Sequence, residues 1–221
     1  MKVKVKVNLD EVLYHKIIES LIRGEYAVGE KIMLNDLCEK FEVSRTPVVQ
    51  AVKMLGKDGI LKIMSNGRVY VPDLEEGTVD QIIEIRRLLE GHALEKTLNG
   101  SKEHVERTIK DLRKYAEQCR ECFEKEEYVE LAMADLKFHR AIVQSAGNKI
   151  MDDLYTGVQG RFIVLNYLIR PLKTRKYERT VEDHFMLIEL MENGKTKEAV
   201  QKLGNHISGS GVPDTETDKE K

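Results

Sequence analysis

From Thr78 onward the apolar residues recur at intervals of three and four positions, and no stretch alternates as a strand does. This spacing places apolar side chains along one face of a helix. The helices are expected at about 78–98, 102–124, 127–146, 149–169, 177–193 and 196–207. The larger part of the chain, residues 78–207, is therefore expected to fold as an all-α helical bundle.

The first 72 residues show a different order of elements. A helix that begins near Asn8 is followed by a short helix at about 35–42. Ser44 is suited to cap a third helix, because Ser at this position accepts a hydrogen bond from the first turn. Pro47 falls in that turn, where a missing N–H costs no helical hydrogen bond.

A hairpin is expected after the third helix. Two short apolar stretches, Ile60–Met64 and Arg68–Val71, are joined by Ser65–Asn66–Gly67, and Asn-Gly between such stretches is a strong hairpin signal. Helix, helix, tight turn, helix and hairpin is the order of a winged helix-turn-helix, whose last helix enters the major groove of DNA. A three-helix cap with a hairpin is the alternative. The predicted fold class is therefore mainly α, with an N-terminal winged helix-turn-helix before the bundle.

Charge also separates the two parts. Residues 1–72 carry 12 Lys and Arg against 9 Asp and Glu, whereas residues 73–221 carry 24 against 29. A basic front and an acidic back suggest different partners. We place the linker at residues 73–77. Residues 208–221, rich in Gly, Ser, Thr and charge, are expected to be a disordered tail.

The composition limits the cellular setting. No apolar run approaches the ~20 residues needed to cross a bilayer, and the N-terminus lacks the apolar core of a signal peptide. Three cysteines do not make a disulfide framework, and Cys119-x2-Cys122 lacks the second pair of a zinc knuckle. The chain is therefore expected to be cytoplasmic, without a membrane partner.

Four polar residues interrupt the apolar faces of three bundle helices. They are Asp135, His139, His184 and His206. A buried carboxylate is costly unless it is paired, and neutral imidazoles cannot neutralise it. One divalent ion would account for all four residues, since imidazole nitrogens and one carboxylate suit zinc, nickel, manganese or iron. Hydrogen-bonded core histidines are the alternative.

Two arginines are candidates for binding an effector. Arg161 falls on a stripe that we expect to face inward, and Arg86 lies in the first bundle helix. A buried guanidinium suits a small carboxylate, which it can bind through two parallel hydrogen bonds. An internal salt bridge is the alternative for both arginines.

One stretch resembles the DNA-binding domain of the GntR family of bacterial transcription regulators; it reads VGEKIMLNDLCEKFEVSRTPVVQAVKMLGKDGILKIMSNGRVYV. Its string VSRTPV is quite specific. The resemblance implies that Arg45 and Thr46 lie at the start of the recognition helix and contact DNA. It also implies that Ser44 caps this helix, that Gly67 forms the tip of the wing, and that Arg68 reaches a phosphate or the minor groove.

The chain departs from this family pattern at three positions. The family usually continues the string as VSRTPVREAL, so Val49 replaces a DNA-contacting arginine and Gln50 replaces a glutamate. A second frequent arginine, early in the preceding helix, is Asn35 here. Each lost cation removes up to one phosphate contact, which predicts weaker salt-dependent binding. Gln50 or Asn35 is available to read bases instead.

The second part resembles the FadR-type C-terminal domain, or FCD domain, of one GntR subgroup; the matching segments read IIEIRRLLEGHALE, ADLKFHRAIVQSAGN, EDHFMLIELMENG and AVQKLGNHI. Many members of that subgroup bind a metal through one Asp and three His. The resemblance implies a zinc, nickel or manganese ion held by Asp135, His139, His184 and His206. The family usually has Asp where Lys195 stands, at the cap of the last helix.

These features together predict a ligand-responsive transcription regulator rather than an enzyme. It would bind palindromic operator DNA as a homodimer, because one recognition helix reads only a few base pairs. Its effector would be a small carboxylate bound at the metal site. A metal-dependent hydrolase or lyase using the Asp/His3 site is one alternative. Metal-independent binding of an effector such as an acyl-CoA is another.

Overall fold

The computed structural model describes residues 8–73, 78–164, 166 and 177–209. Its residues group into two compact units. The first unit comprises Met1–Glu75 and Thr156–Thr174, and the second comprises Glu76–Tyr155 and Arg175–Lys221. The predicted tail at 208–221 lies outside the described residues from position 210 onward, as do residues 74–77 of the predicted linker.

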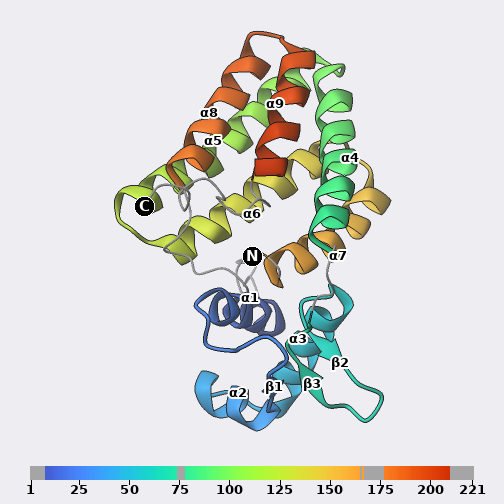
Figure 1. The fold of residues 1–221 in the computed structure, drawn as a ribbon, viewed down its shortest axis with the longest axis vertical. Coiled ribbons are helices and arrows are strands. Elements are labelled where there is room, and N and C mark those ends of the chain that lie inside the picture. Colours follow the sequence, from blue (N-terminus) through green and yellow to red (C-terminus); the bar gives the residue numbers. More distant parts are fainter. Residues whose placement is uncertain (1–7, 74–77, 165, 167–176, 210–221) are drawn as a thin grey trace, which may run out of the picture. The chain divides into compact units, whose positions relative to one another are not determined.

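The first unit contains the expected winged helix-turn-helix (Figure 1). Its helices are α1 (Leu9–Ile22), α2 (Leu34–Phe41) and α3 (Arg45–Lys57). Its strands are β1 (Lys31–Ile32), β2 (Lys62–Ile63) and β3 (Val69–Tyr70). They form one antiparallel sheet in the order β1-β3-β2, with Tyr70 paired to both Lys31 and Lys62. The hairpin β2–β3 was expected, whereas β1 is too short to produce an alternating pattern.

Local chemistry explains the turns of this unit. Glu42 ends α2 in the left-handed conformation, with φ 53°, which produces the tight turn before α3. Gly67 has φ 76° at the tip of the hairpin, a conformation that glycine adopts without a steric penalty. Ser44 occupies the N-cap position of α3, but its hydroxyl makes no capping hydrogen bond. The predicted capping position is therefore confirmed and the predicted capping bond is wrong.

The second unit is a helical bundle. Its helices are α4 (Thr78–Leu98), α5 (Lys102–Glu124), α6 (Tyr128–Ser145), α7 (Lys149–Ile163), α8 (Tyr177–Glu192) and α9 (Thr196–Gly209), with α7 shared between the units. Helix α6 packs against α4 and α5, while α8 packs against α5 and α9. The core between them includes Leu112, Phe138, Ile142, Leu187 and Leu203. These elements match the expected helices, and the expected end of the fourth bundle helix, near residue 169, lies outside the described residues. None of the described helices combines the length and the apolar composition that a membrane span requires.

The C-terminal half of α7 belongs to the first unit. A Cβ atom at Gly160 would lie only 2.0 Å from the carbonyl oxygen of Asp58 and 2.9 Å from a side-chain carbon of Ile60. Such distances are far inside van der Waals contact, so this close approach requires glycine. Helix α7 therefore packs directly against the segment that follows α3.

Candidate functional site

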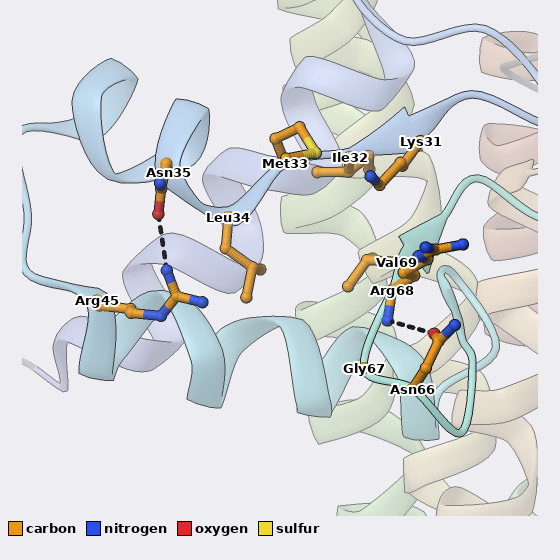
Figure 2. Close-up of a pocket in the computed structure, with 10 residues that line it drawn as sticks. All are labelled: Lys31, Ile32, Met33, Leu34, Asn35, Arg45, Asn66, Gly67, Arg68 and Val69. Carbon is orange, nitrogen blue, oxygen red and sulfur yellow. Dashed lines mark hydrogen bonds between the residues drawn. The ribbon is translucent and has the colours of Figure 1, made fainter.

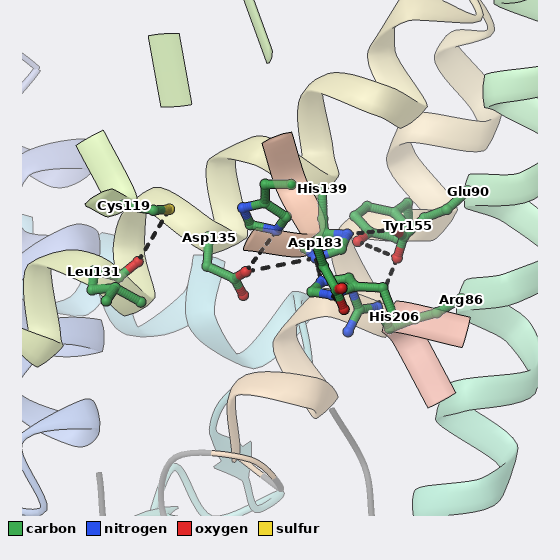
Figure 3. A network of polar contacts seen from close by, with 10 residues as sticks. Arg86, Glu90, Cys119, Leu131, Asp135, His139, Tyr155, Asp183 and His206 are labelled. Carbon is green, nitrogen blue, oxygen red and sulfur yellow. Dashed lines mark hydrogen bonds and ion pairs between the residues drawn. The ribbon is translucent and has the colours of Figure 1, made fainter. Parts of the chain in front are cut away.

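The bundle brings the four predicted metal ligands together. Helix α6 provides Asp135 and His139, which lie one turn apart on the same face, α8 provides His184, and α9 provides His206. One carboxylate oxygen and three ring nitrogens, one from each residue, all lie within 4.8 Å of one another. All four side chains are buried. Figure 3 shows Asp135, His139 and His206 among the residues of the surrounding polar network. The polar interruptions of three separate apolar faces thus converge on one point.

Short distances between donor atoms define the centre of this cluster. His139 Nε2 lies 3.2 Å from His206 Nε2. Asp135 Oδ1 lies 3.3 Å from His184 Nε2 and 3.6 Å from His139 Nε2. The rings of His139 and His206 are stacked, with centroids 5.1 Å apart. This is a set of potential ligand atoms directed at a common centre.

Two further carboxylates determine which ring nitrogens carry protons. Glu90 Oε2 lies 2.6 Å from His139 Nδ1, and Asp183 Oδ2 lies 3.1 Å from His206 Nδ1. Because a carboxylate accepts, we assign the proton of each neutral ring to Nδ1, which leaves a lone pair on Nε2. The two Nε2 lone pairs then face each other at 3.2 Å. That arrangement is repulsive unless a cation or a proton lies between them.

Other buried polar atoms of the cluster make no hydrogen bond. Asp135 Oδ1 and both ring nitrogens of His184 make no hydrogen bond to any described residue. Leaving buried polar atoms unpaired costs free energy, and the cost is largest for a charged group. A bound cation would satisfy these atoms together with the facing lone pairs. The donor set therefore fits a divalent metal ion.

The protonation states are those that metal binding needs. Burial raises the pKa of Asp135, but His139, His184 and His206 lower it more, so it lies well below its usual range. Burial lowers the pKa of His184 and His206, and the nearby aspartates offset this only in part. At neutral pH the aspartate is therefore ionised and these two imidazoles are neutral, as coordination requires.

Glu90 connects the cluster to a buried polar network. It accepts from Arg86 Nε at 2.7 Å and from the Tyr155 hydroxyl at 2.8 Å, besides its contact with His139. Burial by itself would raise the pKa of Glu90, but the interactions with Arg86 and His139 outweigh this effect and lower the pKa to about 2. Glu90 is therefore an ionised carboxylate inside the bundle, and Arg86 neutralises it. The proposed effector role of Arg86 stays a prediction.

Asp183 is the carboxylate that pairs with Nδ1 of His206, as Glu90 does with Nδ1 of His139. It contacts Lys202 as well as the His206 ring, and its pKa, raised by burial, is lowered to about 2 by both partners. Sequence reasoning missed Asp183 and Glu90. The available signals were the position of Asp183 directly before His184 and the four-residue spacing between Arg86 and Glu90.

The expected position of Arg161 is wrong. Its side chain is exposed, and its Nη1 donates to the carbonyl oxygen of Gly157 at 3.1 Å. Leu154, seven positions earlier and so on the same side of the helix, is 61% exposed. The buried residues of α7 are instead Met151 and Tyr155 in its first half and Gly160, Phe162 and Ile163 near its end. The helix does not present one continuous buried face, so its apolar pattern was ambiguous.

The predicted DNA-contacting residues all lie exposed on the first unit. They are Ser44, Arg45, Thr46, Gln50, Gly67 and Arg68. Arg45, Gly67 and Arg68 line one pocket of about 210 Å³ between the start of α3 and the wing (Figure 2). Lys31 adds a third cation, and no acidic residue is among the described residues that line this pocket. Its charge suits an anionic partner.

The family models match both units. The model for bacterial regulatory proteins of the gntR family matches residues 9–71, and the FCD domain model matches residues 81–209. The chain therefore belongs to the GntR family of bacterial regulatory proteins and carries an FCD domain. It is a DNA-binding transcriptional regulator of that family.

Curated relatives agree with this assignment. The chain is 27% identical to the gluconate operon transcriptional repressor of Bacillus subtilis, over 85% of this chain and 76% of the relative. It is 28% identical to the HTH-type transcriptional regulator YdhC of the same organism, over 86% and 83%. These relatives are named as regulators and not as enzymes, in agreement with the expectation from the sequence.

Solved structures show the same fold. E. coli McbR/YncC matches with a TM-score of 0.74 at 18% identity, over 91% of this chain and 94% of that chain. The structure of a transcriptional regulator GntR from Rhodococcus sp. RHA1 matches with a TM-score of 0.73 at 17% identity, over 91% and 94%. The fold class predicted from the sequence is confirmed.

Proposed function

We propose that a small carboxylate, bound at a divalent metal ion in residues 78–207, controls the affinity of residues 1–72 for palindromic operator DNA in the cytoplasm. The residues that would hold the ion are Asp135, His139, His184 and His206. One observation carries the proposal: the Nε2 atoms of His139 and His206 lie 3.2 Å apart beside Oδ1 of Asp135, which makes no hydrogen bond to any described residue. A divalent cation turns this unfavourable arrangement into a favourable one.

Zinc, nickel and manganese suit these nitrogen and oxygen donors. A bound ion would supply a Lewis-acidic position, and four protein ligands leave a place for a carboxylate oxygen on a five- or six-coordinate ion. Glu90 and Asp183 hold the Nδ1 protons of His139 and His206, which keeps both Nε2 atoms available. The names of two relatives refer to the gluconate operon, and gluconate is a hydroxycarboxylate.

The test starts with the metal content of protein purified without chelator. A thermal-shift screen of small organic acids on the metal-loaded protein follows, and each hit is then titrated against operator DNA. We expect a hit to change operator affinity, and by reciprocity operator DNA changes the affinity for the hit by the same factor. A hit that leaves operator affinity unchanged contradicts regulation by that ligand.

A homodimer is also part of the proposal, and exposed apolar residues on α4 and α7 support it. Ile85 and Leu88 on α4 are 41% and 60% exposed, while Ile150 and Leu154 on α7 are 73% and 61% exposed. The two helices are joined by the hydrogen bond between Tyr155 and Glu90. Exposed apolar side chains that gather on one surface mark protein interfaces, and we propose that these four form such a surface.

The double variant Leu88→Glu/Leu154→Glu is therefore expected to be monomeric, because four introduced charges would be buried in a two-fold interface. Light scattering after gel filtration measures the mass. Met186→Glu is the control, since Met186 is 52% exposed on α8 and lies outside this surface. A monomeric wild type, or a double variant that remains dimeric, would contradict the assignment.

Coupling between ligand and DNA is expected to depend on Tyr155. Helix α7 carries Tyr155, which donates to Glu90 in the second unit, and Gly160, which packs against Asp58 in the first. Tyr155→Phe removes the hydroxyl and little else. We expect the variant to retain metal while the effect of an acid ligand on operator affinity becomes smaller. Unchanged coupling, measured by operator titration with and without the ligand, would exclude Tyr155 from this role.

A further inference from the structure

A hydrogen bond joins the two helices of the helix-turn-helix at their exposed N-terminal ends. Arg45, the first residue of α3, donates from Nη1 to Oδ1 of Asn35, the second residue of α2, at 2.7 Å (Figure 2). Both side chains are exposed. An exposed hydrogen bond of this kind contributes little to folding stability, so its effect is mainly on the direction of the arginine.

Fixing Arg45 has a consequence for binding. A free arginine side chain loses rotamer freedom when it is immobilised on a ligand, and that loss weakens binding. In this protein Asn35 restricts the guanidinium before any partner arrives. Because only Nη1 is used by Asn35, the Nε and Nη2 atoms of Arg45 make no hydrogen bond to any described residue. These two nitrogens form one complete donor edge.

The chemistry of that edge and its surroundings suits a guanine. Two parallel guanidinium N–H groups match the O6 and N7 acceptors of guanine in the major groove. Lys31 and Arg68 line the adjoining pocket, and none of its described lining residues is acidic. Asn35 accepts from Arg45 without adding negative charge, so the surface keeps its attraction for phosphates. An arginine in place of Asn35 could not accept and would repel Arg45.

We propose that Asn35 is a positioning residue that holds Nη1 of Arg45 and thereby presents the Nε–Nη2 edge to a guanine of the operator. The proposal rests on the proposed DNA contact of Arg45. Asn35 therefore contributes to base preference through Arg45 and not through a contact of its own.

A double-mutant cycle tests this inference in the full-length protein. Wild type, Asn35→Ala, Arg45→Ala and the double variant are titrated against duplex DNA that was selected from a random pool by the wild-type protein. Asn35→Ala is expected to lower affinity by about 2- to 10-fold, the size of one lost hydrogen bond, and to relax the preference for guanine at one position. In the Arg45→Ala background the same change is expected to have no effect.

Two further variants separate positioning from general effects. Asn35→Asp keeps the acceptor and adds a negative charge, so it is expected to retain the guanine preference while weakening binding to all sequences. Asn99→Ala removes an exposed asparagine outside the DNA-reading unit and is expected to bind as wild type. Thermal unfolding of every variant checks that the fold is unchanged.

The outcomes distinguish the positioning role from the DNA contact itself. An Asn35→Ala loss that persists undiminished in the Arg45→Ala background would overturn the inference, because Asn35 would then contact DNA directly. If Asn35→Ala binds DNA normally while Arg45→Ala binds weakly, the positioning role of Asn35 is also wrong, but the proposed DNA contact of Arg45 still stands. Normal binding by Arg45→Ala would instead contradict the proposed DNA contact on which the inference rests.

Discussion

Treatment with a chelator is expected to lower the melting temperature of the helical unit substantially. The ion would join α6, α8 and α9 through four buried side chains, so its binding free energy stabilises the folded state. At metal concentrations 100- to 1,000-fold above Kd, linkage gives roughly 3–4 kcal/mol, or about 5–15 °C for a chain of this size. Differential scanning fluorimetry of metal-loaded and chelated protein measures the shift.

The variant Asp135→Ala/His184→Ala is expected to retain no stoichiometric metal and to show no such shift. The matched control is Asp153→Ala/His92→Ala, which also removes one aspartate and one histidine but from exposed positions. That control should keep both the metal and the shift. Stoichiometric metal in the first variant, or a wild type that neither holds nor responds to zinc, nickel and manganese, would contradict the proposed site.

Loss of Arg45 is expected to have the largest effect on DNA binding. Arg45 is exposed at the start of α3 and lines the cationic pocket beside the wing. If it pairs with a guanine, Arg45→Ala should cost about 1–3 kcal/mol of discrimination, and if it contacts a phosphate, the salt slope should fall by roughly one. Fluorescence anisotropy with selected operator DNA at several salt concentrations separates these two contacts.

Lys137→Ala provides the control for a change of net charge. Lys137 is exposed on α6, outside the DNA-reading unit, so its removal changes the charge by the same amount at a position remote in sequence. We expect operator affinity to change little. Equal affinity of Arg45→Ala and wild type at every salt concentration would show that Arg45 does not carry recognition.

The architecture was predictable because its signals are local. Apolar periodicity identified each of the described helices of the bundle, and Asn66-Gly67 identified the hairpin β2–β3. The convergence of Asp135, His139, His184 and His206 was also expected, since each interrupts an otherwise apolar helix face. A polar residue at a position that packing reserves for an aliphatic one is visible without coordinates.

The supporting residues were not predictable for a physical reason. Glu90 follows Arg86 by four positions, which in a sequence resembles an ordinary pair on a helix surface. Its other two partners, Tyr155 and His139, lie 65 and 49 positions away in the chain. For Arg161 the error was the reverse, since it was expected to be buried and is exposed. The two halves of α7 belong to different units, so one apolar stripe does not describe the whole helix. The pairing of Asn35 with Arg45 likewise depends on the geometry of the turn between two helices.

The division of α7 between the two units has a consequence for how the protein is made and taken apart. The ribosome completes the DNA-reading residues long before it reaches Gly160, which packs against Asp58. The first unit therefore acquires this part of α7 only after residues 76–155 of the second unit have been translated. A fragment cut at residues 73–77 would lack that segment and expose the surface around Ile60. A DNA-reading unit transferred to another protein of this kind would therefore fit only if that protein also has a glycine at the position of Gly160.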